Sequence, residues 1–218
     1  MALSNPRPLL RGYLHAGAAV VAALGGTYVV VLSSGDRPRQ VSMLVYGAGL
    51  TLLFAVSAVY HVRTWAPARR AILRRIDHAN IFVLIAATYT PVAFNVLSEW
   101  WRVGVLGVTW GAAIAGAGAA VAGVQLRRWA RAALYVGLGW IALAALGQIS
   151  AALPWPAIAL LVTGARRAGR PRNTARRRWP DPWPRVFGYH EVFHLLTIAA
   201  AVALYVLILV YVLPAPRR

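Results

Sequence analysis

The sequence predicts an all-α integral membrane protein, in which residues 1–218 form a single domain with seven transmembrane helices. Hydrophobic residues make up 60% of the chain, whereas a soluble domain is about 45–50% apolar. These residues lie in long uncharged runs, and several runs have the ~20 residues that a helix needs to cross the hydrocarbon layer. The arginines fall between the runs, where membrane proteins carry their interfacial charges.

Polar or arginine-rich connectors separate the predicted spans. In chain order the spans are residues 13–33, 41–62, 77–97, 103–125, 132–153, 154–165 and 190–213. The sixth is the weakest, because LPWPAIALLVTG offers only about a dozen apolar residues, fewer than a comfortable crossing needs. This segment is either a short helix with snorkelling arginines or a re-entrant segment.

The net charge of +18 comes entirely from arginine and sets the predicted orientation. With an odd number of spans, most arginines fall on one side, which places the N-terminus in the cytoplasm and the C-terminus outside. Arginines between apolar runs indicate anionic membrane lipids as partners in the cell membrane and argue against nucleic-acid binding. The N-terminus lacks the pattern of a cleaved signal peptide, so we expect the first span to be retained.

Four ionisable residues lie near the ends of predicted spans: His61, Asp77, His190 and His194. The predicted topology places all four near the cytoplasmic face, at one depth. Ionisable groups within a membrane are costly, so each is a candidate functional residue. The chain has no cysteine, which excludes disulfides and leaves imidazole, carboxylate and water as metal ligands.

The spacing of these residues indicates a zinc site. His190 and His194 are four residues apart and share a helix face, as do Ser57 and His61. Two histidines from one helix and a third from another would form a three-histidine zinc site with an open position for water. Asp77 is then the candidate general base. A single histidine at a membrane edge, however, is more often a hydrogen-bonding residue than a ligand, so the prediction rests on the joint pattern.

Other residues receive structural interpretations. His78 points about 100° away from Asp77 on a helix, and Arg11 and His15 are expected at the entry of the first span. Asn95 is expected to form hydrogen bonds between helices. Glu191 completes an H-E-x-x-H sequence, in which the glutamate of a zinc peptidase acts as base; spacing alone does not exclude that role.

Three segments carry a family resemblance: SAVYH, IDHANIFVLIAATYTP and FGYHEVFH. They resemble, in order, the signature segments of the hemolysin III family, which belongs with the progestin and adipoQ receptors. The resemblance implies seven helices and a zinc ion held by His61, His190 and His194. It also implies that Asp77 interacts with zinc-bound water beside Ser57. Adiponectin receptors in this group are linked to ceramide hydrolysis.

One segment departs from the family pattern. Bacterial relatives have an apolar stretch containing glycine and tyrosine before a Pro-Asp-Pro turn, whereas residues 165–179 here read ARRAGRPRNTARRRW. A local reading-frame error and a genuinely short sixth helix both account for it. The proposed ligands lie outside this segment.

Three functions follow from these observations. The first is a zinc-dependent membrane hydrolase that acts on a lipid, such as an amide, with Asp77 as base and Ser57 as an orienting or charge-stabilising group. The second is a non-enzymatic sensor, receptor or cytolysin with structural zinc. The third is an intramembrane protease that uses Glu191 as base. The sequence leaves the substrate and the oligomeric state open.

Overall fold

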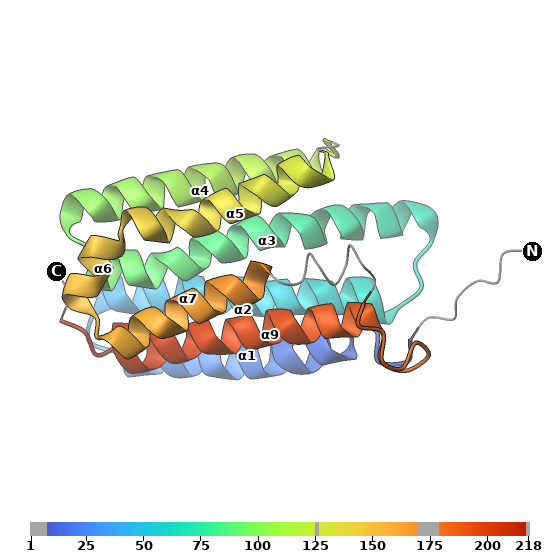
Figure 1. Ribbon diagram of the computed structural model, residues 1–218, viewed down its shortest axis with the longest axis horizontal. Coiled ribbons are helices and arrows are strands. Elements are labelled where there is room, and N and C mark those ends of the chain that lie inside the picture. The colour runs from blue at the N-terminus through green and yellow to red at the C-terminus, as the bar shows by residue number, and fades with distance from the viewer. Residues whose placement is uncertain (1–7, 125–126, 170–178, 217–218) are drawn as a thin grey trace, which may run out of the picture.

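The computed structural model describes residues 8–124, 127–169 and 179–216. Figure 1 shows a bundle of helices that run side by side along one long axis. Its helices are α1 (Tyr13–Leu32), α2 (Arg37–Val62), α3 (Pro67–Val96), α4 (Glu99–Val121), α5 (Arg128–Ala144), α6 (Leu146–Ala152), α7 (Trp155–Gly169) and α9 (Tyr189–Leu207), which continues into the π-helical η1 (Ile208–Val212). The described residues contain no strand, so the predicted all-α class is confirmed.

Five helices are long and apolar enough to cross a membrane: α1, α2, α3, α4 and α9 with η1. The predicted fifth span is a pair of helices, because α5 and α6 meet at an angle of 52°. Counted as one span, this pair raises the number to 6. Helix α7 is apolar only from Trp155 to Gly164, which is shorter than a full crossing, so a seventh span and the orientation of the termini stay predictions. The anomalous segment is part of α7 up to Gly169; residues 170–178 lie outside the described residues.

Helix α3 begins ten residues before the predicted span. Pro67 stands in its first turn, where the missing N–H costs nothing. The following arginines, alanine and leucine are good helix formers, and Arg69, Arg70 and Arg74 are exposed. Hydropathy predicted only the apolar part of this helix, from residue 77 onward. In the structure Asp77 lies inside α3 and not at its start.

Helices α2 and α3 form the centre of the bundle. About half of their membrane-length windows are buried, 56% and 50%, against 17–28% for α1, α4 and α9. Helix α1 packs on α2, α2 on α3, α3 on α4, and α7 on α9. The outer helices expose large side chains such as Val20, Leu24 and Ile114, as expected where lipid is the solvent.

A polar network joins helices at the end of the bundle where α3 ends. Arg39 donates from Nε to Asn95 Oδ1 (3.0 Å) and from Nη2 to the carbonyl of Ala215 (2.7 Å). Asn95 also donates to Ser42 Oγ (3.3 Å). The predicted role of Asn95 between helices is therefore confirmed, and this network lies at the opposite end from the residues discussed next.

Helices α1 and α2 touch through two glycines, and this contact gives a testable prediction. A Cβ atom on Gly47 would lie 2.8 Å from the Cα of Gly26, whereas a Cβ on Gly111 in α4 would meet nothing within 4 Å. Gly47→Ala is therefore expected to destabilise the bundle by about 1–3 kcal/mol through overpacking. Gly111→Ala, the matched control, should leave stability unchanged or slightly raised. Reversible unfolding of both variants in detergent measures the difference; equal stabilities would contradict the close α1–α2 contact.

Candidate metal centre

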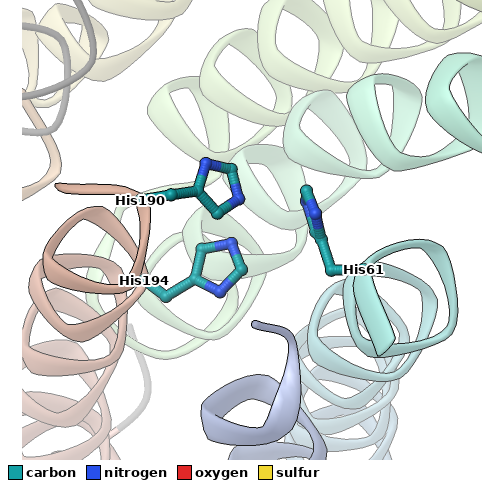
Figure 2. A group of neighbouring side chains, drawn as sticks. All are labelled: His61, His190 and His194. Carbon is teal, nitrogen blue, oxygen red and sulfur yellow. The ribbon is translucent and has the colours of Figure 1, made fainter. Parts of the chain in front are cut away.

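Three histidines from two helices face one another at one end of the bundle. His61 lies in the last turn of α2, and His190 and His194 lie in the first two turns of α9. One nitrogen from each ring lies within 4.8 Å of the others. Figure 2 shows His190 and His194 on one side of the shared space and His61 on the other. The ring centroids are 4.5 Å (His61–His190), 5.0 Å (His61–His194) and 4.5 Å (His190–His194) apart.

The donor set suits a metal ion. His194 is 1% exposed, and its Nδ1 is buried with no hydrogen-bond partner among residues 8–124, 127–169 and 179–216. A buried imidazole nitrogen with no partner is costly unless something binds it. Zinc bonds imidazole nitrogen at about 2.0–2.1 Å, so modest rotation of the rings would bring three nitrogens into one coordination shell. The predicted convergence of α2 and α9 is present.

Ser57 and Asp77 lie beside this group without joining it. Ser57 is one turn before His61 on α2 and is buried, and its hydroxyl hydrogen-bonds the Asp77 carboxylate on α3. Asp77 is not a member of the three-residue ligand group. Asp77 is therefore linked to the histidine group through Ser57, and the roles of the two residues at the centre stay predictions.

The glutamate of the H-E-x-x-H sequence has a different role. Glu191 is fully buried, and its Oε1 accepts a hydrogen bond from Arg11 Nε (2.9 Å) in an ion pair. Its Oε2 accepts from the backbone N–H of Gly188 (2.9 Å), which caps the start of α9. Both carboxylate oxygens are thus engaged in holding the helix start, and the geometry gives no support to Glu191 as the base of a peptidase.

His15 is a residue of this centre that sequence reasoning missed. It is 3% exposed in the first turn of α1, and its ring stacks on His194 with centroids 3.8 Å apart and planes 10° apart. Its Nδ1 lies 2.8 Å from Ser57 Oγ. The available signal was its position: the predicted topology also places the start of the first span at the depth of the other histidines.

The segment before α1 is attached to the segment before α9. The N–H groups of Leu9 and Leu10 donate to the carbonyls of Arg185 and Val186, at 3.0 and 3.1 Å. Gly12 adopts a φ of 86°, and a Cβ there would lie 2.8 Å from the backbone nitrogen of Val62. Only glycine accommodates both the left-handed backbone and this close approach. The ends of α1, α2 and α9 are thereby held together around the histidines.

His78 does not join the histidine group. It is half-buried on α3 next to Asp77, and its backbone carbonyl accepts a hydrogen bond from Tyr135. Among the described residues, the group of converging ring nitrogens contains only His61, His190 and His194. The structural interpretation of His78 agrees with this placement.

Comparison with known sequences matches this chain to one protein family and to several relatives. The profile of a family described as "Haemolysin-III related" matches residues 3–205. The chain is 26% identical over 196 residues to "Hemolysin-3 homolog" of Bacillus subtilis (strain 168), covering 90% of this chain and 89% of the relative. It is 26% identical over 180 residues to "Hemolysin-3" of Bacillus cereus, covering 83% and 79%. A shorter match, 34% identical over 86 residues, joins it to "Monocyte to macrophage differentiation factor" of Homo sapiens, covering 36% and 34%.

Proposed function

The chain belongs to the haemolysin-III-related family of integral membrane proteins, and on that premise we propose that it is a zinc-dependent hydrolase of membrane lipids. The observation that carries the proposal is the group of three histidine nitrogens within 4.8 Å of one another at the end of a membrane bundle. His61, His190 and His194 would hold the ion. Three protein ligands leave one coordination position open, as in catalytic zinc sites.

The chemistry divides between the ion and the neighbouring side chains. When bound, zinc supplies Lewis acidity that polarises a carbonyl oxygen and makes water reactive near neutral pH. Asp77 accepts the proton of the attacking water and returns it to the leaving group. Ser57, hydrogen-bonded to Asp77, holds the carboxylate in one orientation.

A lipid is the substrate class that best fits the surroundings. The centre lies at the ends of α2 and α9, and the orientation predicted by the arginines puts it at the cytoplasmic leaflet. An apolar groove of about 410 Å³ beside it is lined by residues of α1 and α2, including Ala16, Ala58 and Val62, with Arg63 at its edge. An acyl chain matches such a lining, and an amide or ester carbonyl at its head supplies the reacting group.

The direct test uses purified protein loaded with one equivalent of zinc and a panel of lipid amides and esters, with ceramide among them. Release of a fatty acid is the expected result. If fully loaded protein leaves the whole panel intact, the hydrolase proposal fails. The second function considered from the sequence, a sensor or cytolysin with structural zinc, is then tested by measuring liposome leakage caused by the wild type and by His61→Ala. Leakage that the substitution leaves unchanged favours a lytic role independent of the metal.

Asp77→Asn is expected to reduce lipid turnover by about 10²–10⁴-fold, the usual contribution of a general base. Zinc content should remain unchanged, because Asp77 is outside the ligand group. Glu99→Gln is the matched control, because Glu99 is an exposed carboxylate at the start of α4. Turnover assays and metal analysis on the same preparations check both expectations. If Glu191→Gln abolished the activity of the protein while Asp77→Asn kept it in full, Glu191 would be the base, as the peptidase interpretation requires.

A further inference from the structure

We propose that His15 is a positioning residue of the metal centre, which fixes the ring of His194 and the hydroxyl of Ser57 without binding the ion itself. This inference rests on the proposed metal site. It begins from the burial of His15, which is 3% exposed on the otherwise largely exposed helix α1. A polar ring placed so deeply is costly unless its polar atoms have specific partners; Nδ1 of His15 has one in Ser57 at 2.8 Å, whereas Nε2 has none among the described residues.

The stacked geometry excludes His15 as a fourth ligand of the same ion. An imidazole directs its nitrogen lone pair within the plane of its ring. The rings of His15 and His194 are nearly parallel, at 10°, with centroids 3.8 Å apart. An ion in the plane of His194 would therefore lie well outside the plane of His15. The contact instead limits how the His194 ring can rotate, and the ring of Phe54 also packs against His15 (centroids 5.0 Å apart, planes at 62°).

The surroundings of Ser57 indicate which atom donates in its hydrogen bond with His15. A serine hydroxyl carries one proton and can also accept hydrogen bonds, and the side chain of Asp77 lies near enough to Ser57 to take that proton. In the arrangement that we infer, Ser57 Oγ accepts from His15 Nδ1–H, at 2.8 Å. The order is His15 Nδ1–H to Ser57, then Ser57 O–H to Asp77. His15 thus contacts the ligand His194 directly and reaches the candidate base Asp77 through Ser57.

Two substitutions separate these contacts. His15→Asn keeps a donor near the position of Nδ1 but removes the ring that stacks on His194. His15→Phe keeps the stacked ring but removes the donor to Ser57. Tyr46→Phe is the control, because Tyr46 is a 1% exposed aromatic residue of α2, and its buried hydroxyl oxygen has no hydrogen-bond partner within the ranges that the structure describes.

The first measurement is cobalt affinity, with the cobalt absorption spectrum as a record of ligand geometry. His15→Asn is expected to weaken affinity by about 10–100-fold, the usual effect of losing a group that orients a ligand, and to alter the spectrum. His15→Phe and Tyr46→Phe should bind cobalt with the wild-type spectrum. Thermal unfolding of the metal-free proteins, run in parallel, separates loss of folding from loss of ligand orientation.

The second measurement needs no metal. Protein labelled with ¹⁵N-histidine should show a solvent-protected Nδ1–H proton signal that disappears in His15→Phe and shifts in Ser57→Ala. A signal that is unchanged in Ser57→Ala would overturn the inferred contact. Cobalt binding that is identical in wild type and His15→Asn would overturn the positioning role and leave the metal site intact. Wild-type protein that binds no cobalt would overturn the proposed function and this inference together.

Discussion

His194→Ala is expected to abolish stoichiometric zinc binding. His194 is the most buried of the three ligands, and its Nδ1 has no hydrogen-bond partner in the described part of the chain. Removing it leaves two imidazoles from different helices, and three protein ligands are the minimum in catalytic zinc sites. The loss of affinity should exceed the ~10–100-fold that substitutions outside the ligand shell cause. Metal analysis after purification in detergent measures this directly.

The same substitution separates metal binding from folding. A ligand that binds only the folded state stabilises it in proportion to the logarithm of its concentration over its dissociation constant. A chelator should therefore lower the unfolding temperature of wild-type protein and leave that of His194→Ala unchanged. His78→Ala is the matched control, because His78 lies outside the ligand group, and it should retain zinc. One equivalent of zinc in purified His194→Ala would contradict the proposed centre.

Glu191→Ala is expected to destabilise the protein by about 3–5 kcal/mol, the usual cost of removing one partner of a buried ion pair. Arg11 is 23% exposed and would lose its only carboxylate partner among the described residues, while the N–H of Gly188 would lose its acceptor. Glu191→Gln keeps an acceptor for Gly188 and a neutral contact for Arg11, so its loss should be smaller. Unfolding in detergent measures both.

A double-substitution cycle tests whether the effect comes from this pair. Arg11→Ala combined with Glu191→Ala should cost less than the sum of the single substitutions, because the two side chains act on one contact. Glu99→Ala, at an exposed carboxylate, should change stability by less than about 0.5 kcal/mol. Additive losses from Arg11→Ala and Glu191→Ala would show that the ion pair is not what holds the start of α9.

The ion pair also explains why an H-E-x-x-H sequence is misleading in this chain. In a zinc peptidase the glutamate must reach water beside the ion. Here the residue after His190 turns toward Arg11 and the N-terminus of its own helix. The two histidines keep their ligand spacing, while the glutamate serves the helix start. Only the partner of Glu191 distinguishes these cases, and that partner lies 180 residues away in the chain.

The membrane character and most of the helices could be predicted because their cause is local. A run of apolar residues needs no distant partner to favour a helix in lipid, since the helix satisfies its own backbone hydrogen bonds. The predicted helix bounds are wrong where the structure does not follow from a run of apolar residues. The ten residues from Pro67 to Ile76 are helical through propensity and not hydropathy, and the 52° bend between α5 and α6 left no sign in the apolar pattern.

By itself, the sequence determined an all-α membrane bundle and the pairing of His190 with His194, because hydropathy and helical periodicity act over a few residues. It also indicated a common depth for His61, Asp77 and the last-span histidines through the placement of arginines. The tertiary structure alone decided that His15 stacks on His194 and that Glu191 pairs with Arg11. Such contacts depend on how each helix is rotated about its axis relative to its neighbours. Side-chain packing between helices sets that rotation, and local sequence patterns do not show it.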